Sequence, residues 1–441
     1  MSRCIGLDFG TTNSALSIAD GESVSLARFD DGGRATDTFR SIVYFDAHER
    51  DNRGRAAALA GPKAIARYLG SDGSGRLIQS LKSQLASRLF QSTNVFGRTF
   101  GLAELIAVIL RRLRDEAEAT VGPLGTKLVV GRPVRFTHAE TAEDDAFAVA
   151  RLRDALALAG FEEIVFEYEP VAAAYHYERT LDHDELVLIA DFGGGTSDFC
   201  LIRVGPGVKK RGRRPDDILG TEGVALAGDA FDSELVSHVV SPALGMGSLY
   251  ELPLDMARER EPARTMAVPP WIFQKLRRWH HLSFLKSKET MELLHDLRKQ
   301  SLEPHKLESL LHVIEHDLGF HLYKSVEKAK VSLSSEASTR FLFSDGEPVH
   351  IEREVERAEF DQWISTELAQ IEGCVDRLLQ KTNVPSSSVD RVFTTGGSSL
   401  VPAVRSVFSR RFGEAKLRAG DELTSVALGL ALRAKDEAAR A

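Results

Sequence analysis

The sequence has few cysteines and no long apolar run. Its three cysteines, Cys4, Cys200 and Cys374, are odd in number and far apart along the 441 residues. Two of them lie in β-prone runs, so we expect the cysteines to be reduced thiols in the core of a cytoplasmic protein rather than parts of a disulfide framework. No apolar stretch approaches the length of a membrane span, and the first predicted strand starts at the N-terminus without a signal peptide. We therefore expect no membrane association.

Basic residues are fewer than acidic ones. The chain carries 56 Lys and Arg residues against 64 Asp and Glu residues, a formal net charge of −8. This balance argues against a general nucleic-acid binder, although it leaves local basic patches open. With 43% hydrophobic and 27% charged residues, the composition is that of an ordinary globular protein. The length allows two to four domains with substantial cores.

What the sequence does contain is a glycine-rich turn between two β-prone runs, in residues 186–204. An apolar run leads into the three glycines 193–195, and a second apolar run follows at once, which predicts a hairpin. Backbone N–H groups of consecutive glycines can converge on an anion, because no Cβ interferes. Asp191 and Asp198 flank the turn and can hold a hydrated Mg²⁺, which prefers few carboxylates and many waters. The turn therefore predicts a phosphate-binding loop.

The same order of residues occurs near the N-terminus. Residues 4–18 repeat an apolar run, the sequence Asp8-Phe9-Gly10, a small hydroxylated turn and a second apolar run. One such motif alone can be an ordinary glycine turn, but two in the same order argue against that interpretation. An internal repeat of this kind predicts two lobes of similar build, each offering a loop to one polyphosphate.

The rest of the chain predicts alternating strands and helices, and hence an α/β fold. We expect a helical segment from Ala56 to Leu69 that is broken at Gly61-Pro62, an amphipathic helix from Gly101 to Thr120, and another helix from about Glu140 to Ala159. Residues 241–321 are expected to be mostly helical. Asp345-Gly346 is expected to form the turn of a hairpin.

Three motifs suggest other functions. The basic run from Lys209 to Arg214 can bind nucleic acid or phosphorylated partners, but a solvated loop is the favoured interpretation. His312-Val-Ile-Glu315-His316 matches the H-x-x-E-H zinc-peptidase pattern, yet nothing else in the chain points to a zinc site, so incidental histidines on a solvated helix are favoured. Asp-Phe-Gly is also found in protein kinases, but here it occurs twice and without the other kinase motifs.

Taken in order, the motifs resemble the nucleotide-binding part of DnaK-type heat-shock ATPases. These belong to the actin-like superfamily, which includes sugar kinases, and the resemblance is closest to the short YegD-type members. Residues 5–14 and 191–198 are similar to the two phosphate motifs of that family, and residues 169–174 resemble its connecting motif. Residues 327–334 and 396–398 resemble its adenosine-binding parts.

The resemblance implies an actin-like ATPase fold. Each of two lobes would hold a ribonuclease-H-like mixed sheet and an inserted subdomain, with a nucleotide cleft between the lobes. Lobe I would span residues 1–183, with its insertion at about 37–120, and lobe II residues 184–415, with its insertion at about 229–365. Residues 416–441 would form a C-terminal helix that returns to lobe I.

The resemblance also implies ATP or ADP and Mg²⁺ as ligands and assigns roles to single residues. Lys82 would neutralise the γ-phosphate and orient the attacking water, with a surface lysine on a helix as the alternative. The implied catalytic residues are Lys82, Glu169, Asp191 and Thr196, and the implied metal-site residues are Asp8, Asp191 and Asp198. The implied nucleotide contacts are Gly10, Thr11, Thr12, Asn13, Gly193, Gly194, Gly195, Thr196, Gly228, Glu327, Lys330, Ser334, Gly396, Gly397 and Ser398.

Two departures from the family pattern bear on function. Val331 and Leu400 stand where the family has base-stacking arginines, so the base would be held by apolar contact or more weakly. The sequence ends at Ala441, directly after the helix that closes the first lobe, so we expect no peptide-binding domain, lid or interdomain linker in this chain.

The resulting hypothesis is a protein that binds Mg-ATP and hydrolyses it slowly, with phosphoryl transfer to water. It would act as a nucleotide-gated binding module or atypical chaperone, with a protein partner or client at residues 241–321 or at the basic run. A small-molecule kinase of the sugar-kinase type and a filament-forming actin-like protein are the alternatives within the superfamily.

Overall fold

A computed structural model describes most of the chain. The described residues are 3–21, 23–51, 54, 56–71, 75–252, 265–278, 282, 285–420 and 424–438. They form two compact units, one of residues 1–228 with 368–441 and one of residues 229–367. Residues 439–441, which were expected in the C-terminal helix, lie outside the described residues. Among the described helices, none combines the length and apolar content that a bilayer crossing requires.

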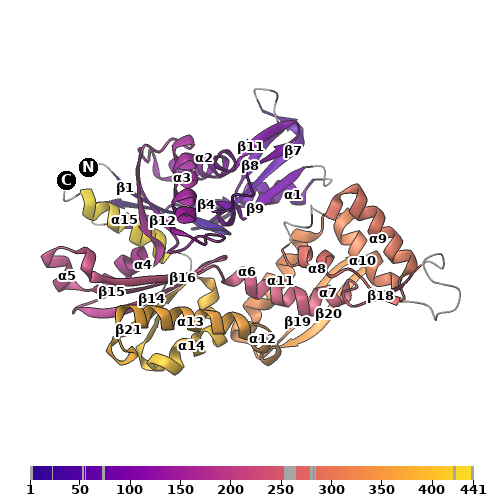
Figure 1. The fold of residues 1–441 in the computed structure, drawn as a ribbon. Coiled ribbons are helices and arrows are strands. Elements are labelled where there is room, and N and C mark those ends of the chain that lie inside the picture. The colour runs from indigo at the N-terminus through magenta and orange to yellow at the C-terminus, as the bar shows by residue number, and fades with distance from the viewer. Residues whose placement is uncertain are drawn as a thin grey trace. The chain divides into compact units, whose positions relative to one another are not determined.

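The first unit is built on two mixed sheets with the same topology (Figure 1). In the first sheet, β1 (Cys4–Phe9) and β2 (Asn13–Asp20) are antiparallel, and β1 is parallel to β12 (Lys127–Arg132). In the second sheet, β14 (Glu185–Phe192) and β15 (Ser197–Val204) are antiparallel, and β14 is parallel to β21 (Arg391–Thr395). The repeated sequence motif therefore forms the central hairpin of each sheet.

The outer strands complete the correspondence. β13 (Glu163–Tyr168) lies parallel beyond β12, and β22 (Leu417–Ala419) lies parallel beyond β21. β3 (Ser23–Leu26) pairs antiparallel with β2, and β16 (Ile218–Val224) pairs antiparallel with β15. Both sheets thus run in the order parallel, parallel, antiparallel, antiparallel. The internal repeat extends from two hairpins to two whole sheets.

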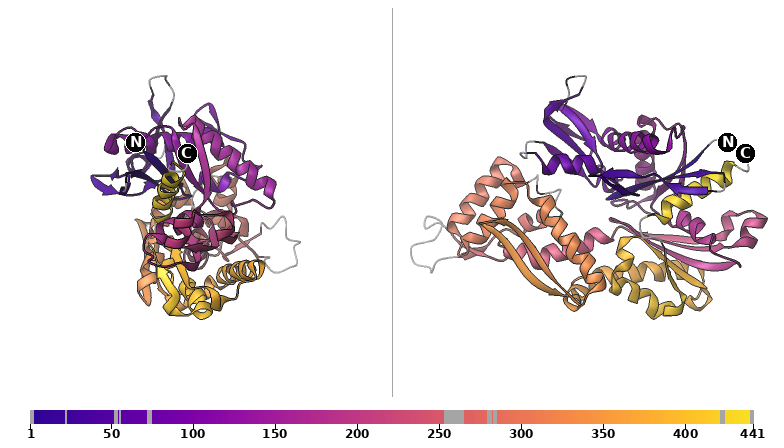
Figure 2. Two further views of the ribbon diagram at one scale, coloured as in Figure 1. Left: turned by 90° about the vertical axis from the view of Figure 1, so that its left-hand side faces the viewer. Right: turned by 180° about the vertical axis from the view of Figure 1, so that it is seen from behind.

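Two helices cover the first sheet, and a third joins distant parts of the chain. The core of the first sheet packs against α2 (Leu102–Val121) and α3 (Ala142–Leu158), which confirms the helices expected there. α15 (Ser425–Ala438) packs on β1, β2 and α4 (Glu169–Glu178), so the two ends of the chain lie side by side, as Figures 1 and 2 show. Ser17 in β2 donates to the Ala427 carbonyl in α15.

Smaller elements surround the first sheet. β6 (Phe39–Arg40) pairs antiparallel with β2 and so belongs to that sheet. The others are β4 (Phe29–Asp31), β5 (Arg34–Thr36), β7 (Ile42–Arg50), β8 (Ala56–Ala60), α1 (Pro62–Leu69), β9 (Arg76–Gln79), the 3₁₀ helix η1 (Leu81–Gln84), β10 (Ser92–Val95) and β11 (Arg98–Gly101). The helical segment expected from Ala56 to Leu69, broken at Gly61-Pro62, is wrong in the part before the break. Residues 56–60 form β8, because pairing with β7 overrides the helix propensity of an alanine-rich segment. The helix starts at Pro62, a residue that suits a first helical turn.

The second sheet is flanked by α5 (Pro206–Arg211), α13 (Ser365–Thr382) and α14 (Pro402–Phe412). The basic run was expected to be a solvated loop, and this is wrong in part. Lys209 to Arg211 end α5, and Arg213 is buried in an ion pair with Glu178 at 2.7 Å. Arg211 pairs with Asp217. Two of the basic side chains are therefore committed to internal contacts.

The second unit contains mainly helices and one long hairpin. Its helices are α6 (Gly228–Leu235), a π-helix (Val236–Val240), α7 (Ser241–Ala243), α8 (Pro270–Leu276), α9 (Lys288–Gln300), α10 (Pro304–Glu315), α11 (Gly319–Ser335) and α12 (Arg357–Trp363). Residues 241–321 were expected to be mostly helical, and most of the described residues in this range are helical. The range also contains two short antiparallel strands, β17 (Leu249–Glu251) and β18 (Thr265–Ala267). β19 (Ser338–Gly346) and β20 (Val349–Glu356) form the long hairpin, whose turn lies at Glu347-Pro348 rather than at Asp345-Gly346.

Candidate phosphate-binding site

The two glycine-bearing turns of the first unit lie next to each other. The turn between β14 and β15 is closed by the N–H of Gly193, which donates to the Thr196 carbonyl at 2.9 Å. A Cβ atom placed on Gly195 would lie 3.5 Å from Oγ1 of Thr11, in the turn between β1 and β2. The same atom would lie 3.4 Å from Oγ1 of Thr137. The turns are thus close enough to contact one ligand, and a side chain at residue 195 would enter the space between them.

Four carboxylates gather beneath these turns. Asp8 comes from β1, Asp191 from β14, Asp198 from β15 and Glu169 from the start of α4. Burial and the charge of Glu169 raise the pKa of Asp8 to about 7, against the opposing charge of Lys82. Burial and the same carboxylate also raise the pKa of Asp191 well above its usual range. The cluster therefore carries more negative charge than its surroundings neutralise.

Lys82 supplies a positive charge to this cluster. It lies on η1, its Nζ is 2.6 Å from Oε1 of Glu169, and the whole residue is only 7% exposed. Burial alone lowers the pKa of Lys82, but the charges of Glu169 and Asp8 outweigh it and the net pKa is raised. Lys82 is therefore a buried, charged residue, and the alternative of a surface lysine is wrong.

Asp198 is fixed by the segment that follows β12. The backbone N–H of Val134 donates to its Oδ1 at 2.6 Å. Burial and the charge of Glu169 raise the pKa of Asp198 to about 7, although the hydrogen bonds from Thr196 and Val134 act in the opposite direction. The backbone contact links the first sheet to the central hairpin of the second. Val134 and Thr137 carry no motif of their own, so sequence reasoning missed both.

A third turn adjoins the second glycine-bearing turn. Gly396 follows β21 with φ +85°, and a Cβ on it would lie only 2.1 Å from the Phe192 carbonyl oxygen, so the close approach requires glycine. Ser398 is buried in the turn. Gly228 also approaches this region, because its N–H donates to the Gly193 carbonyl at 3.4 Å. Residues 396–398 and Gly228 are thus neighbours of the candidate site.

The remaining expected contacts lie in the second unit, on α11. Nζ of Lys330 is 2.8 Å from Oδ1 of Asp232 on α6, and burial raises the pKa of Asp232 to about 6 against the opposing charge of that lysine. Glu327 is one turn away and forms an ion pair with Lys324 at 2.9 Å. Ser334 donates to the Lys330 carbonyl. The sequence gave no role to Asp232, which is the ion-pair partner of Lys330 within the second unit.

The structure brings part of the expected set together in the first unit. These residues are Asp8, Gly10, Thr11, Thr12, Asn13, Lys82, Glu169, Asp191, Gly193, Gly194, Gly195, Thr196, Asp198, Gly228, Gly396, Gly397 and Ser398. Glu327, Lys330 and Ser334 belong to the second unit. The two residues that replace arginines are largely exposed, Val331 at 63% and Leu400 at 43%.

The carboxylates fit a hydrated cation rather than a direct metal cage. Within the part of the chain that the structure describes, no three His, Cys, Asp or Glu side chains are arranged to bind one metal ion directly. Mg²⁺ keeps several of its waters and uses one or two protein carboxylates, so the spread of Asp8, Asp191 and Asp198 suits it. Burial, and then the charge of Glu169, raise the pKa of Asp8 and Asp198, and the charge of a cation there would oppose both effects.

The H-x-x-E-H motif has an ordinary structural explanation. His312 lies on α10 with Nε2 3.0 Å from Oδ2 of Asp345, and its ring is 4.2 Å from the His316 ring. The two histidine rings pack on each other, and among the described residues no third side chain is arranged with them to bind a metal ion. The interpretation as a zinc site therefore has no support.

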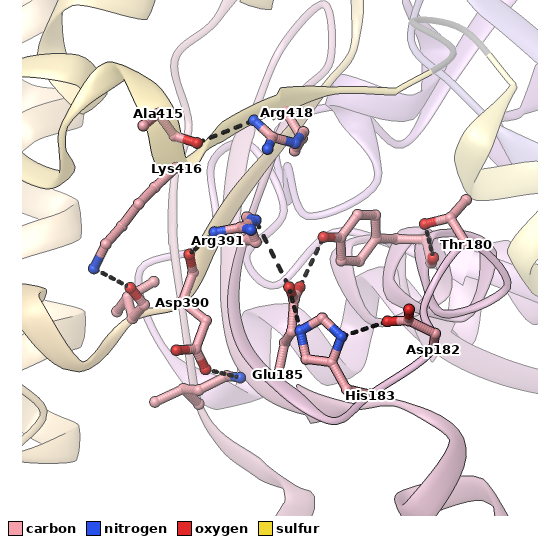
Figure 3. Close-up of polar contacts among 12 residues, drawn as sticks. Thr180, Asp182, His183, Glu185, Asp390, Arg391, Ala415, Lys416 and Arg418 are labelled. Carbon is pink, nitrogen blue, oxygen red and sulfur yellow. Dashed lines mark hydrogen bonds and ion pairs between the residues drawn. The ribbon is translucent and has the colours of Figure 1, made fainter.

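A second polar cluster joins α4 to the second sheet (Figure 3). Glu185, at the start of β14, accepts a hydrogen bond from the Tyr177 hydroxyl at 2.8 Å. Nε2 of His183 lies 3.2 Å from Glu185, and Nε of Arg391 lies 3.6 Å from it. The hydrogen bond to Asp182 raises the pKa of His183. These contacts connect α4, which begins with Glu169, to β14, which ends near Asp191, so we assign the cluster a structural role.

Comparison with protein families identifies the family of this chain. The family model for Hsp70 protein matches residues 4–245 and 315–436. Both glycine-bearing turns, Lys82, Glu169 and the turn at Gly396 lie inside these ranges, whereas residues 246–314 lie outside them. The match and the two mixed sheets confirm the expected actin-like ATPase fold.

Proposed function

Because the chain belongs to the Hsp70 protein family, we propose that its first unit binds Mg-ATP between the two glycine-bearing turns and hydrolyses it slowly. Members of this family bind ATP and ADP, and membership relates the chain to the ATPase domains of heat-shock chaperones. The observation that carries the proposal is the closeness of the turns, since a Cβ on Gly195 would lie 3.5 Å from Oγ1 of Thr11. Two sets of backbone N–H groups can then share one triphosphate.

Phosphate binding follows from the chemistry of the turns. Backbone amides of Gly10 to Asn13 and of Gly193 to Thr196 donate to the β- and γ-phosphates, and the Thr12 and Thr196 hydroxyls add further donors. Hydrogen bonds to an ionised group contribute roughly 1.5–3 kcal/mol each, so several together dominate the affinity. A magnesium ion held through water by Asp8, Asp191 and Asp198 would neutralise phosphate charge.

Hydrolysis in this proposal depends on Lys82. Glu169 keeps the lysine protonated, because its carboxylate lies 2.6 Å from Nζ. The ammonium group places a fixed positive charge beside the transferring phosphoryl group and orients the attacking water. Asp8, Asp191 and Asp198 would hold the hydrated ion, which would neutralise further phosphate charge. This arrangement supports phosphoryl transfer to water rather than covalent catalysis.

We further propose that the output is a change of conformation sensed by a protein partner, as in a short, YegD-type member of the family. The segment outside the family match supports this, because it exposes several large apolar side chains in the second unit. They are Met246, Leu249, Met266, Trp271, Leu293 and Leu302. Exposed apolar side chains of this kind are typical of protein interaction surfaces. The exposed Val331 and Leu400 support a base held by apolar contact.

Calorimetry tests the proposed ligand directly. ATP and ADP should bind with micromolar or tighter affinity in the presence of Mg²⁺ and more weakly without it. The preference for ATP over GTP should be smaller than in a site that stacks the base on arginines, since this site would hold the base without cation–π stacking. Absence of saturable heat with all three nucleotides would overturn the proposal. Recovery of the phosphate on an added sugar rather than in water would indicate a small-molecule kinase instead.

A further inference from the structure

A groove lies in the first unit beside the segment that carries Lys82. Its volume is about 500 Å³, within the usual range for small-ligand sites. It is formed by the loop after η1 and by one face of α3. The lining residues are Arg88, Phe90, Gln91, Phe147 and Arg151.

The groove combines two guanidinium groups with an aromatic floor. The Arg88 guanidinium lies 5.0 Å from the centre of the Phe147 ring, and the Arg151 guanidinium lies 5.1 Å from it. Phe147 and Phe90 are half-buried, so each still presents part of its ring. Guanidinium groups bind carboxylates through paired N–H donors, and phenyl rings favour flat apolar groups.

The charge in the groove is only partly neutralised. Arg88 pairs with Asp144 at 3.2 Å. No described carboxylate forms an ion pair with Arg151, which donates instead to backbone carbonyls, and burial lowers its pKa. A half-buried cation without an anionic partner is stabilised by any anion that reaches it.

We propose that this groove binds a carboxylate carried on a flat apolar group. The carboxylate would contact the guanidiniums of Arg88 and Arg151, and the apolar group would lie against Phe147 and Phe90. Two sources share this chemistry: a free aromatic carboxylate, and the C-terminal residue of a partner chain that ends in Phe or Tyr. Leu89, at 98% exposure, stands beside the groove and offers further apolar contact to a longer ligand.

The groove is connected to Lys82 through Arg151. Its guanidinium donates to the carbonyls of Gln84 at 3.2 Å and Leu85 at 3.0 Å, which are the last residue of η1 and the residue after it. It also donates to the carbonyls of Ser87 at 3.0 Å and Phe90 at 2.7 Å. A ligand that immobilises Arg151 would therefore immobilise the segment that positions Lys82. This makes the groove an effector site, a consequence that rests on the proposed ATPase function.

Binding is tested first and without nucleotide, by NMR titration of the full chain with benzoate. Saturable shifts are expected with a dissociation constant of about 1 mM or tighter. Benzyl alcohol, which lacks the charge, and acetate, which lacks the ring, should each bind at least about tenfold more weakly, as should inorganic phosphate. A peptide ending in Phe that binds more tightly than benzoate would identify a partner chain as the source, and the reverse order a free carboxylate. The shifts are followed in residues 88–91 and 147–151, which carry the groove, so that phosphate bound at the two turns is not counted. No saturable shift there with benzoate or the peptide, or equal binding of acetate or phosphate there, would overturn the proposal.

A matched pair of variants locates the site. Arg88→Gln should weaken benzoate binding at least about tenfold. Arg98→Gln is the control, because Arg98 also lies over a phenylalanine, Phe100 at 4.2 Å, and near a carboxylate, but outside the groove. Equal loss in both variants, or in neither, would place benzoate elsewhere.

The effector role has its own readout. Saturating benzoate should raise the single-turnover rate of ATP hydrolysis at least about twofold, because a better-positioned Lys82 lowers the cost of organising the site. It should also slow amide exchange in residues 85–91. Binding without either change would overturn the effector role. Slowed exchange in a protein that does not hydrolyse ATP would count against the proposed function and not against the groove.

Discussion

At the scale of single residues, the candidate phosphate-binding site is built on charged side chains that are buried together. Lys82 and Glu169 form a buried ion pair at 2.6 Å, within a group of three further carboxylates. Asp8, Glu169, Asp191 and Asp198 lie in motifs that the sequence shows, whereas Lys82 was expected only from the resemblance to the family. It could not predict that Val134 donates to Asp198, because a backbone N–H has no sequence signature. Contacts of this kind depend on how two sheets meet, which the local sequence does not specify.

The first prediction concerns Lys82. Lys82→Ala should lower single-turnover ATP hydrolysis by at least about 100-fold, because it removes the charge that stabilises the transferring phosphoryl group. ATP binding should survive, since the turns supply most donors. Lys127→Ala is the control, because Lys127 is an exposed lysine that also pairs with a glutamate, Glu163. Equal rates in both variants and the parent would remove Lys82 from the site.

The second prediction concerns repulsion among the carboxylates. The folded protein raises the pKa of Asp8 from 3.8 to about 7, so it binds a proton that the unfolded chain has lost. This destabilisation develops as pH rises from about 4 and is complete above about 7, so the thermal midpoint of the nucleotide-free protein should fall over that range. Asp8→Asn should raise the midpoint at about pH 8 and flatten its pH dependence, while weakening Mg-ATP binding.

Thermal unfolding of parent and variant between about pH 5 and pH 8 checks this. The expected result is a gap in midpoint that widens as pH rises. A gap that stays constant would show that nearby positive charge compensates the Asp8 carboxylate in the folded protein, so that its pKa is not raised.

At the scale of elements, the strands and helices with strong periodicity were predictable and the short ones were not. The amphipathic helix expected from Gly101 to Thr120 corresponds to α2. Residues 56–60 became β8 because β7 lay beside them, which no local pattern could show. In the basic run, Arg213 found a buried partner in Glu178, although the run itself is typical of a solvated loop. In both cases a partner distant in sequence decided the outcome.

The third prediction concerns the anchor between β7 and α1. Asp46 is buried, and although burial alone raises its pKa, the hydrogen bond from Arg67 at 2.6 Å and two backbone N–H groups lower the pKa to about 2. A lowered pKa means that the stabilisation is present above the unfolded value of 3.8 and is lost as pH falls toward 2. Asp46→Asn should therefore lower the unfolding free energy by about 1–2 kcal/mol near neutral pH, allowing for the exposure of Arg67.

Urea unfolding from about pH 7 to pH 3 measures this loss. The difference between parent and Asp46→Asn should be constant down to about pH 5 and shrink below about pH 4. Asp20→Asn is the control, because Asp20 is exposed and its pair with Arg3 is long, at 3.7 Å. A difference that does not change with pH would show that the lost hydrogen bonds do not depend on the charge of Asp46.

At the scale of the whole molecule, a repeat of fifteen or so residues in the sequence marks a repeat of entire sheets. Only the central hairpins kept a recognisable sequence, because glycines and aspartates at a phosphate-binding turn have few substitutes. The outer strands kept the topology alone, since many apolar residues satisfy a buried strand. The sequence therefore predicted the actin-like fold with its two mixed sheets from its most constrained parts, and the roles of the candidate site residues stay a prediction. The groove at Arg151 has no such constraint and could be found only in the structure.

The most direct test of a triphosphate shared by two turns is calorimetry of Mg-ATP binding to Gly195→Ala and Gly373→Ala. Both positions have room for a Cβ within the protein, with no neighbour of that atom closer than 3.4 Å. The methyl group at residue 195 would occupy the space between the turns, whereas the one at residue 373 lies on α13. Gly195→Ala should weaken ATP binding by at least about tenfold, while Gly373→Ala should bind ATP like the parent. Equal affinity for all three proteins would contradict a triphosphate shared by the two turns.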